Sequence, residues 1–410
     1  MTRIAVIGTL DTKGPEIAYV RDGIRALGAE AVVIDSGILG EAAGCVADVP
    51  REQVAREGGH DLESIRAAGS RGAAVERMLE GVRAVVTRLW REGELHGVLT
   101  LGGAEGALLG AAAMQALPLG VPKVLVTPSA SGRRPFGPFV GESDVLVMHS
   151  VVDILGLNPI SRAVFDNAVA AVVGMAVTAG RPVADLGGKT VGITMLGHTT
   201  PAVMRILETL RAAGHEPVVF HANGVGGPAM EKLVAAGALA GVIDYTLSEL
   251  ANTVRDGLHA TGPTRLTVAG EHGVPQVVVP GCVDFFNQGA PSSLPPEYAR
   301  RKRYYHNPVA TLVRLEADEM AELGTMIAER LNGATAPVSV MVPTRGFSLA
   351  DVEGGDLWDP DADAAFVDAL EASLGDEIVF ERIDTHVNDP AFADLVAARY
   401  LALVSSPAPA

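Results

Sequence analysis

Residues 8–16, "GTLDTKGPE", bring hydroxyl, carboxylate and ammonium groups together in one short turn. They follow an apolar run, "RIAVI" (3–7), that predicts a β-strand, and they precede a segment that predicts a helix. The backbone N–H groups and the dipole of a helix N-terminus attract anions, and Lys13 adds a positive charge. We therefore expect an anionic ligand to be bound by Thr9, Asp11, Thr12, Lys13 and Gly14.

The same turn has a simpler interpretation, in which Asp11 or Thr12 only caps the helix. The order of its residues matches neither G-x-x-x-x-G-K-[ST] nor G-x-G-x-x-G, the two common phosphate-binding motifs. The motif alone therefore supports ligand binding and helix capping about equally.

Two further loops follow predicted strands in the first half of the chain. In "LGGAEG" (101–106), Gly102 and Gly103 allow close approach of a ligand, and Glu105 suits a sugar hydroxyl or a metal. A tight packing turn explains this loop almost equally well. In "TPSASG" (127–132), Ser131 and Gly132 add a hydroxyl and backbone N–H groups. Together the three loops predict a ligand that carries phosphate or carboxylate.

The second half of the chain has more titratable side chains at predicted strand ends. The candidate residues there are His198, Thr199, Thr200, His221, Asn223, Gly224, Glu249, Asp284, His306 and Arg345. Imidazoles and carboxylates of this kind could form a divalent metal site or an acid–base pair. The sequence has no H-x-x-x-H or H-E-x-x-H spacing that would fix a metal, and no G-x-S-x-G motif. Covalent hydrolase chemistry is therefore disfavoured.

Composition argues against several classes of protein. A net charge of −17 disfavours nucleic-acid and anionic-membrane partners, because binding phosphates requires clustered cations. Cys45 and Cys282 lie far apart without metal-type spacing, as expected of a reduced cytoplasmic protein. No signal peptide is visible at the N-terminus. The longest apolar stretch, 168–179, is too short to span a bilayer and predicts a buried helix.

The pattern of elements indicates two similarly built halves. Shifted by 186 residues, the start of the chain lies without a gap on "KTVGITMLGHTTPAVMRILETLRAAGHEPVVF". Pro15 then falls on Pro201, and Gly28 falls on Gly214. Each copy reads as a strand, a polar turn, a helix opened by proline and ended by glycine, and a second strand. Near-continuous apolar strands between helices predict parallel sheets covered on both faces.

A chain of 410 residues exceeds the usual size of one hydrophobic core, so we expect two domains. The predicted fold class is α/β, with two Rossmann-like domains that face each other across a cleft. The N-terminal, nucleotide-binding domain is expected at 1–183, the C-terminal, substrate-binding domain at 184–404 and a flexible tail at 405–410. Segment 41–72, rich in glycine and charge, is expected to leave the first sheet as a lid or a dimer arm.

Seven motifs occur in order: "IGTLDTKGPE", "GGAEG", "SVVDI…NPISR", "GHTTP", "FHANGVGG", "YYHNP" and "VPTRGFS…DLWDPDAD". They resemble those of the tomato-mosaic-virus-resistance-type ATP-binding domain family, an uncharacterised family with bacterial, fungal and plant members. The resemblance runs from Arg3 to about Ala398. It implies two Rossmann-like subdomains, binding of ATP and Mg²⁺, and a homo-oligomer; the family has no established reaction to carry over.

The first hypothesis is therefore an ATP-binding enzyme that transfers a phosphoryl or adenylyl group to a small substrate, such as a carboxylate, in the interdomain cleft. Lys13 would neutralise phosphate, and Asp153 or Glu105 would hold Mg²⁺. The catalytic candidates are His198, His221, Glu249 and Arg345; the candidates for binding substrate are Thr199, Thr200, Asn223, Gly224, Asp284 and His306. One alternative is a regulatory module that binds ATP or another anion without turnover. Another is a metal-assisted lyase or hydrolase centred on the C-terminal domain.

Overall fold

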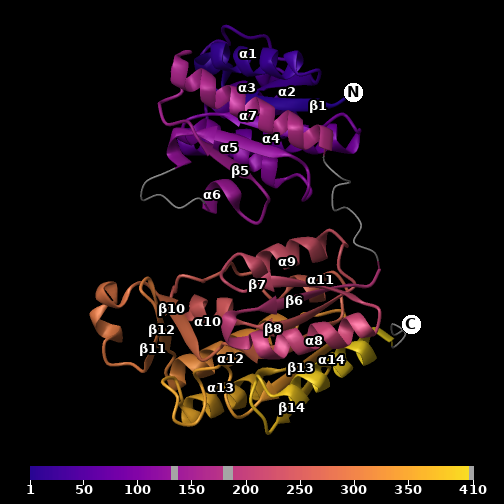
Figure 1. The fold of residues 1–410 in the computed structure, drawn as a ribbon, viewed down its shortest axis with the longest axis vertical. Helices are drawn as coiled ribbons and strands as arrows, with labels where there is room; N and C mark the ends of the chain where they lie inside the picture. Colours follow the sequence, from indigo (N-terminus) through magenta and orange to yellow (C-terminus); the bar gives the residue numbers. More distant parts are fainter. Residues whose placement is uncertain (131–136, 179–187, 406–410) are drawn as a thin grey trace. The chain divides into compact units, whose positions relative to one another are not determined.

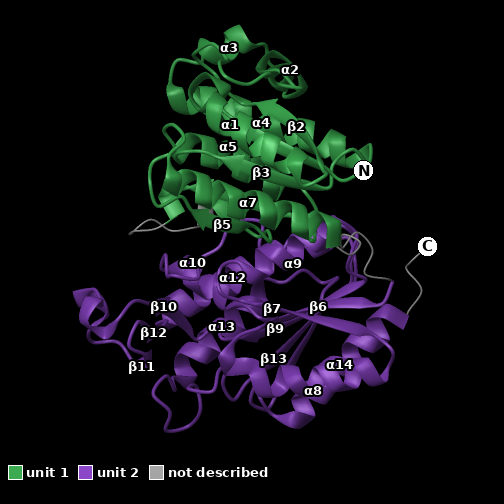
Figure 2. Cartoon of the chain, turned by 45° about the horizontal axis from the view of Figure 1, so that its top comes forward, with its two compact units in different colours: residues 1–184 green, residues 185–410 purple. Residues whose placement is uncertain are grey.

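The structure is a computed structural model of the 410-residue chain, and it describes residues 1–130, 137–178 and 188–405. The chain forms two compact units, Met1–Ala184 and Asp185–Ala410 (Figure 2). The predicted domain boundary at 183/184 falls within 179–187, outside the described residues. The predicted tail at 405–410 also lies outside them, apart from Ser405.

The first unit is a parallel five-stranded sheet with strand order β2-β1-β3-β4-β5 (Figure 1). Its strands are β1 (Arg3–Gly8), β2 (Glu30–Asp35), β3 (Gly97–Leu101), β4 (Lys123–Thr127) and β5 (Leu146–His149). Its helices are α1 (Leu10–Ala26), α2 (Arg51–Glu57), α3 (Leu62–Arg66), α4 (Arg71–Arg91), α5 (Ala104–Gln115), α6 (Gly137–Val140) and α7 (Pro159–Thr178).

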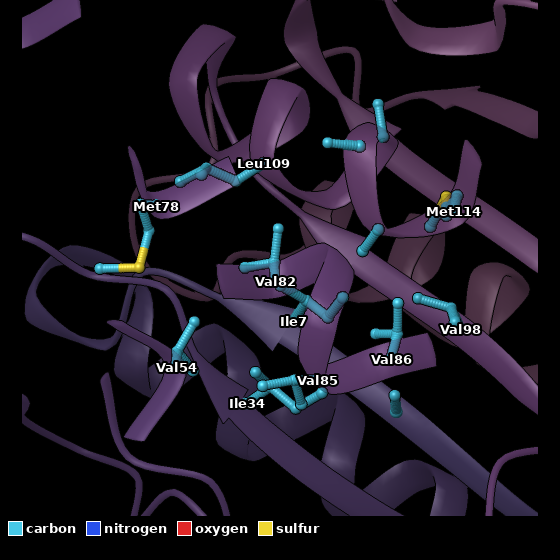
Figure 3. Close-up of a cluster of buried hydrophobic side chains, with 14 of the residues drawn as sticks. Ile7, Ile34, Val54, Met78, Val82, Val85, Val86, Val98, Leu109 and Met114 are labelled. Carbon is cyan, nitrogen blue, oxygen red and sulfur yellow. The ribbon is translucent and has the colours of Figure 1, made fainter. Parts of the chain in front are cut away.

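Helices cover both faces of this sheet. Successive side chains of a strand point to opposite faces, so Ala5 and Ile7 of β1 pack in the core that contains α2 to α5. Ile4 and Val6 pack on the other face, in the core that contains α1 and α7. Figure 3 shows the first of these cores, where Val82 and Val86 of α4 lie near Ile7. Because both faces are buried, β1 is apolar from Ile4 to Gly8 rather than alternating.

Segment 41–72 was predicted to be a lid or a dimer arm, and this prediction is wrong. It contains α2 and α3, and the side chains of Val54, Ala55, Leu62 and Ile65 are buried in the same core as α4 and α5. The glycine and charge content of the segment reflects its exposed side and its turns. It is a layer of the first unit.

Helix α7 includes the apolar stretch 168–178 that was expected to be a buried helix. It buries one side, with Phe165, Ala168, Val169, Val172 and Val173 in the core beside α1. By length and composition alone it is also the single helix of the described residues that could cross a membrane. One third (33%) of the apolar segment that meets this test is buried. Core helices of globular domains meet the same criteria of length and composition.

The second unit is a parallel six-stranded sheet with order β14-β13-β9-β8-β6-β7, joined by an antiparallel sheet with order β10-β12-β11. Its strands are β6 (Thr190–Met195), β7 (Glu216–His221), β8 (Gly241–Thr246), β9 (Gln276–Gly281), β10 (Phe285–Gln288), β11 (Arg303–Asn307), β12 (Ala310–Arg314), β13 (Val338–Pro343) and β14 (Val379–Ile383). Its helices are α8 (Thr200–Ala212), α9 (Gly226–Ala235), α10 (Ser248–Val254), α11 (Val268–Glu271), α12 (Ala317–Leu331), α13 (Pro360–Ser373) and α14 (Pro390–Ser405).

The two parallel sheets share a strand order, which confirms the prediction of two similarly built halves. The order β7-β6-β8-β9 repeats the order β2-β1-β3-β4. A shift of 186 residues carries β2 onto the bounds of β7 and the last residue of α1 onto the last residue of α8. In the second unit α8 and α14 cover one face, and α10, α12 and α13 cover the other. The predicted α/β class, with mostly parallel sheets flanked by helices in two domains, is confirmed.

Helices α12 and α13 pack so closely that Gly324 has no room for a side chain. A Cβ at this position would lie 2.6 Å from the carbonyl oxygen of Phe366 and 2.9 Å from the backbone nitrogen of Leu370. Both atoms belong to the backbone of α13, so relief requires the helices to separate.

Replacing Gly324 by alanine should lower the free energy of unfolding of the second unit by about 1–3 kcal/mol, less the gain of roughly 1 kcal/mol in helix propensity. Urea unfolding followed by Trp358 fluorescence in a Trp90→Phe background reports on this unit, because the chain has two tryptophans, one in each unit. Gly333→Ala is the control, since its Cβ would meet no atom within 4 Å. Equal unfolding midpoints for the two variants would contradict the close packing.

Candidate functional site

A cavity of about 680 Å³ lies at the carboxyl ends of β1 and β3. Strand β1 lies between β2 and β3, so the chain runs outward in both directions from this point of the sheet. Open parallel sheets bind their ligands at such a switch point. Six residues predicted to bind a cofactor line the cavity: Thr9, Asp11, Thr12, Lys13, Gly103 and Glu105. The structure thus brings the opening turn and the LGGAEG loop to one place.

Asp35, at the end of β2, caps α1 in place of the predicted Asp11 or Thr12. Its Oδ1 accepts hydrogen bonds from the backbone N–H groups of Leu10, at 3.1 Å, and Gly37, at 2.8 Å. The N-cap residue, Thr9, makes no capping bond with its own side chain. Burial raises the pKa of Asp35, although the two N–H groups oppose this shift. The capping alternative for Asp11 and Thr12 is therefore wrong, and the sequence signal for Asp35 was its place at a predicted strand end.

The polar groups of the opening turn are turned toward the cavity. The Thr9 and Thr12 hydroxyls lie 2.9 Å apart, and Lys13 has no hydrogen-bond or ion-pair partner in residues 1–130, 137–178 and 188–405. The carboxylate of Asp11 accepts from the N–H of Gly40 through Oδ2, at 3.0 Å. Its Oδ1 is buried with no partner among the described residues. Both a cation and hydroxyl donors therefore border the cavity.

Two other residues predicted to bind the cofactor, Gly14 and Gly102, are required by close packing of the backbone. A Cβ on Gly14 would lie 1.5 Å from the Ala43 carbonyl oxygen, so this glycine allows segment 41–45 to pack on α1. A Cβ on Gly102 would lie 2.6 Å from the backbone of Gly106, in the first turn of α5. Gly103 has open space instead. Ser131 and Gly132 lie outside the described residues.

Asp153, the predicted metal ligand, lies in the segment between β5 and α7. It is exposed, and it does not line the described part of the cavity. A different residue, Arg71 at the first position of α4, does line it and forms an ion pair of 2.6 Å with Glu105. Sequence reasoning missed Arg71 because its position depends on how α4 docks against the sheet. No local pattern marks it.

His198 has the most unusual environment in the second unit. It lies just before α8, with only 7% of its surface exposed, and its Nδ1 has no partner within the described part of the chain. Its ring centroid is 5.4 Å from that of Phe285, 5.5 Å from that of Tyr304 and 6.0 Å from that of His306. Burial, with a smaller effect from His306, lowers the pKa of His198 to about 4. The imidazole is therefore neutral at physiological pH.

Further histidines gather near His198. Burial, followed by the charges of His221 and His306, lowers the pKa of His259 to about 4. The predicted residues His198, His221 and His306 thus lie in the same region as His259, which sequence reasoning missed. Over the described ranges, however, no three His, Cys, Asp or Glu side chains are arranged to hold a metal ion. The arrangement supports acid–base chemistry better than metal binding.

Glu249, a predicted catalytic carboxylate, is held in a buried ionic network. Its Oε1 accepts from the N–H groups of Gly224, at 2.9 Å, and Gly227, at 3.0 Å, and its Oε2 lies 2.6 Å from Nε of Arg265. Arg265 is buried and also pairs with Asp244. With both oxygens engaged and no solvent exposure, Glu249 fixes the glycine-rich loop before α9. This is a correction of the predicted role, because the side chain cannot reach a substrate.

The hydroxyls of Thr199 and Thr200, at the start of α8, form hydrogen bonds within the second unit. The Thr199 hydroxyl accepts from the N–H of Leu196 at 3.2 Å and lies 2.8 Å from the Thr246 hydroxyl. The Thr200 hydroxyl donates to the Leu196 carbonyl oxygen at 3.3 Å. Gly224 adopts a φ of +94°, and Asn223 beside it is half-buried. The backbone N–H of Asn223 donates to the carbonyl oxygen of His221 at 2.8 Å.

Arg345 and Asp284 are both held by other side chains of the second unit. Arg345 follows β13 and is exposed, with both ends of its guanidinium bound by Asp384 at 2.6 and 2.7 Å. Asp284 is fully buried and accepts a 2.8 Å hydrogen bond from the Ser348 hydroxyl. Burial, reinforced by Asp351, raises the pKa of Asp284 to about 7. The same causes raise the pKa of Asp363, which pairs with buried Arg314, to about 8.

These shifts predict that the second unit loses stability as pH rises from 6.5 to about 8. Asp284 and Asp363 hold protons in the folded chain that they release in the unfolded chain, so each lowers the free energy of unfolding by up to about 1.4 kcal/mol per pH unit. Between pH 4 and 6.5 the lowered pKa values of His198 and His259 act with the opposite sign.

The measurement is urea unfolding at pH 6.5, 7.2 and 8.0, followed by Trp358 in the Trp90→Phe background. Asp363→Asn should flatten the dependence, whereas Asp361→Asn, at an exposed position of the same helix, should leave it intact. A free energy that does not fall over this range would show that the buried carboxyls are ionised.

Comparison with known proteins identifies the family. The N-terminal domain of uncharacterised protein family UPF0261 matches residues 2–181, and its C-terminal domain matches residues 188–404. A UPF0261 protein of Clostridium tetani is 38% identical over 401 residues, covering 97% of this chain and 98% of that protein. The ToMV resistance protein Tm-1 of Solanum lycopersicum is 34% identical over 419 residues, covering 97% of this chain and 55% of that protein.

Among solved structures, a UDP-GlcNAc 2-epimerase of Methanocaldococcus jannaschii aligns with 68% of this chain and 83% of its own. At 10% identity and a TM-score of 0.22, this likeness carries no argument about function. The two domain matches and the identity to full-length relatives are decisive: the chain belongs to the UPF0261 family and is a homologue of Tm-1.

Proposed function

We propose that the first unit binds ATP, with the phosphates in the switch-point cavity lined by Thr9, Lys13 and Gly103. The observation that carries this proposal is the meeting of two helix N-termini, those of α1 and α5, at one cavity that also contains an unpartnered lysine in the described part of the chain. Backbone N–H groups at such ends bind phosphate without a cationic surface. The acidic composition of the chain is therefore compatible with an anionic ligand.

The carboxylates of the cavity fit a magnesium ion. Asp11 and Glu105 both line it, and Oδ1 of Asp11 is buried with no partner in the described ranges. Without a cation these groups would repel phosphate, and oxygen ligands are those that Mg²⁺ prefers. Asp11 and Glu105 would hold the ion, which would neutralise phosphate charge when bound.

The second unit offers imidazole groups to an enzymatic function. His198 is neutral at physiological pH and its Nδ1 is unpartnered among the described residues, so its ring can hydrogen-bond to a substrate, whereas a pKa of about 4 makes it a weak base. His306 lies beside it, with ring centroids 6.0 Å apart, and is exposed. A phosphoryl or adenylyl transfer to a small substrate uses groups that orient the attacking atom. A regulatory module would bind ATP equally well, and turnover of ATP in the presence of substrate separates the two.

Calorimetric titration of the full chain with ATP and Mg²⁺ should show micromolar binding that weakens at least tenfold, about 1.4 kcal/mol, in Lys13→Ala. Removing the ammonium takes away the charge that borders the phosphates. Arg25→Ala is the matched control, because it removes an exposed positive charge from the last turn of the same helix.

Three results are informative. Weakening by Lys13→Ala alone would support phosphate binding at the opening turn. Equal weakening by both variants would mean that only the general charge of the unit matters. Absence of heat with the parent chain at several temperatures would overturn the proposal.

A further inference from the structure

The ion pair between Arg71 and Glu105 is weakly held. Nε and Nη2 of Arg71 both approach Oε2 of Glu105 at 2.6 Å, but 74% of the arginine side chain is exposed. Exposed ion pairs contribute little to stability, typically 0–1 kcal/mol. A ligand phosphate, which binds guanidinium with two parallel hydrogen bonds, can therefore compete for Arg71.

This ion pair borders two cavities. Arg71 and Glu105 line the switch-point cavity and also a neighbouring cavity of about 480 Å³. Ile38 and Leu39 line both cavities as well. The two spaces therefore adjoin, with one charged pair at their junction.

The two cavities differ in chemistry. Apart from Arg71 and Glu105 at the junction, the neighbouring cavity is lined by four apolar residues, Ile38, Leu39, Ala67 and Ala74, with the hydroxyl of Ser70 and the guanidinium of Arg66 as polar groups. The switch-point cavity has the Thr9–Lys13 turn and the start of α5. An apolar ring fits the first kind of surface and phosphate fits the second. A ligand that occupies both must join an apolar, hydrogen-bonding group to an anionic one.

We propose that a nucleotide spans both cavities, with its nucleoside in the neighbouring cavity and its phosphates extending toward Lys13. At the junction, the guanidinium of Arg71 gives up its ion pair with Glu105 and binds the phosphate attached to the nucleoside. This inference rests on the function proposed above. It adds the orientation of the nucleotide and names Arg71 as the residue that binds the phosphate attached to the nucleoside. Glu105, once released, is available to a magnesium ion or a ribose hydroxyl.

The orientation has distinct consequences for Arg71, Lys13 and Glu105. Arg71 contacts the phosphate that AMP, ADP and ATP share, so its removal weakens all three nucleotides by a similar factor. Lys13 lies at the far end of the phosphates, so its removal weakens ATP more than AMP. Glu105 competes with phosphate for Arg71, so neutralising Glu105 tightens binding of nucleotide in the absence of metal.

The experiment is calorimetric titration of the full chain with AMP, ADP and ATP, each with EDTA and with Mg²⁺. Arg71→Met should weaken each nucleotide about tenfold, and Arg71→Lys should restore part of the loss. Glu105→Gln should tighten ATP in EDTA several-fold. Arg83→Met is the control, because it removes an exposed arginine of α4 that does not line either cavity.

Each outcome has a defined meaning. If the parent does not bind ATP, the proposed function itself fails. If the parent binds and Arg71→Met binds equally, the inference alone is overturned. Weakening of ATP but not AMP by Arg71→Met would reverse the orientation and overturn it too. Weakening by Glu105→Gln in EDTA would show that Glu105 positions Arg71 for the ligand, and would exclude the exchange.

Discussion

The carboxylate of Asp35 determines the geometry of the first unit's ligand edge. One oxygen binds the N–H of Leu10, which begins α1, and the N–H of Gly37, which begins the loop after β2. The loop and the helix are thereby joined across two neighbouring strands, and Asp11 adds a second link through Gly40. Because Asp35 occupies the cap of α1, the hydroxyls of Thr9 and Thr12 and the ammonium of Lys13 are left for the cavity.

In the second unit, the same strand order carries different residues at the corresponding positions. A shift of 186 residues places His221 at the position of Asp35 and Leu196 at the position of Leu10. The N–H of Leu196 is bound by the Thr199 hydroxyl, and His221 is exposed at the strand end. Thr12 is replaced by His198, which is buried among aromatic rings. One strand order thus carries a turn with hydroxyl and ammonium groups in one unit and a histidine-rich edge in the other.

Much of this could be predicted from sequence, because it depends on local patterns. Apolar runs separated by helical segments predict parallel sheets, and polar turns at strand ends predict where Thr9, Lys13 and Gly103 meet. The pattern cannot show which polar side chains become buried. Glu249 follows a strand as Lys13 does, yet it is engaged by Arg265, which reaches it only through the packing of the segment between α10 and α11. Arg71 likewise reaches the cavity only through the docking of α4.

The acidic side chains of the cavity limit the kind of anion that the proposed site could accept. Asp11 and Glu105 border the cavity against the single lysine of the opening turn, and Arg71 is paired with Glu105. A free polyanion would meet more repulsion there than attraction, since charges a few ångströms apart interact strongly near a protein surface. Backbone N–H groups add attraction without net charge, and a bound divalent cation removes the repulsion. In the proposed ATP site, these carboxylates would therefore favour a nucleotide that binds together with a metal ion over phosphate alone.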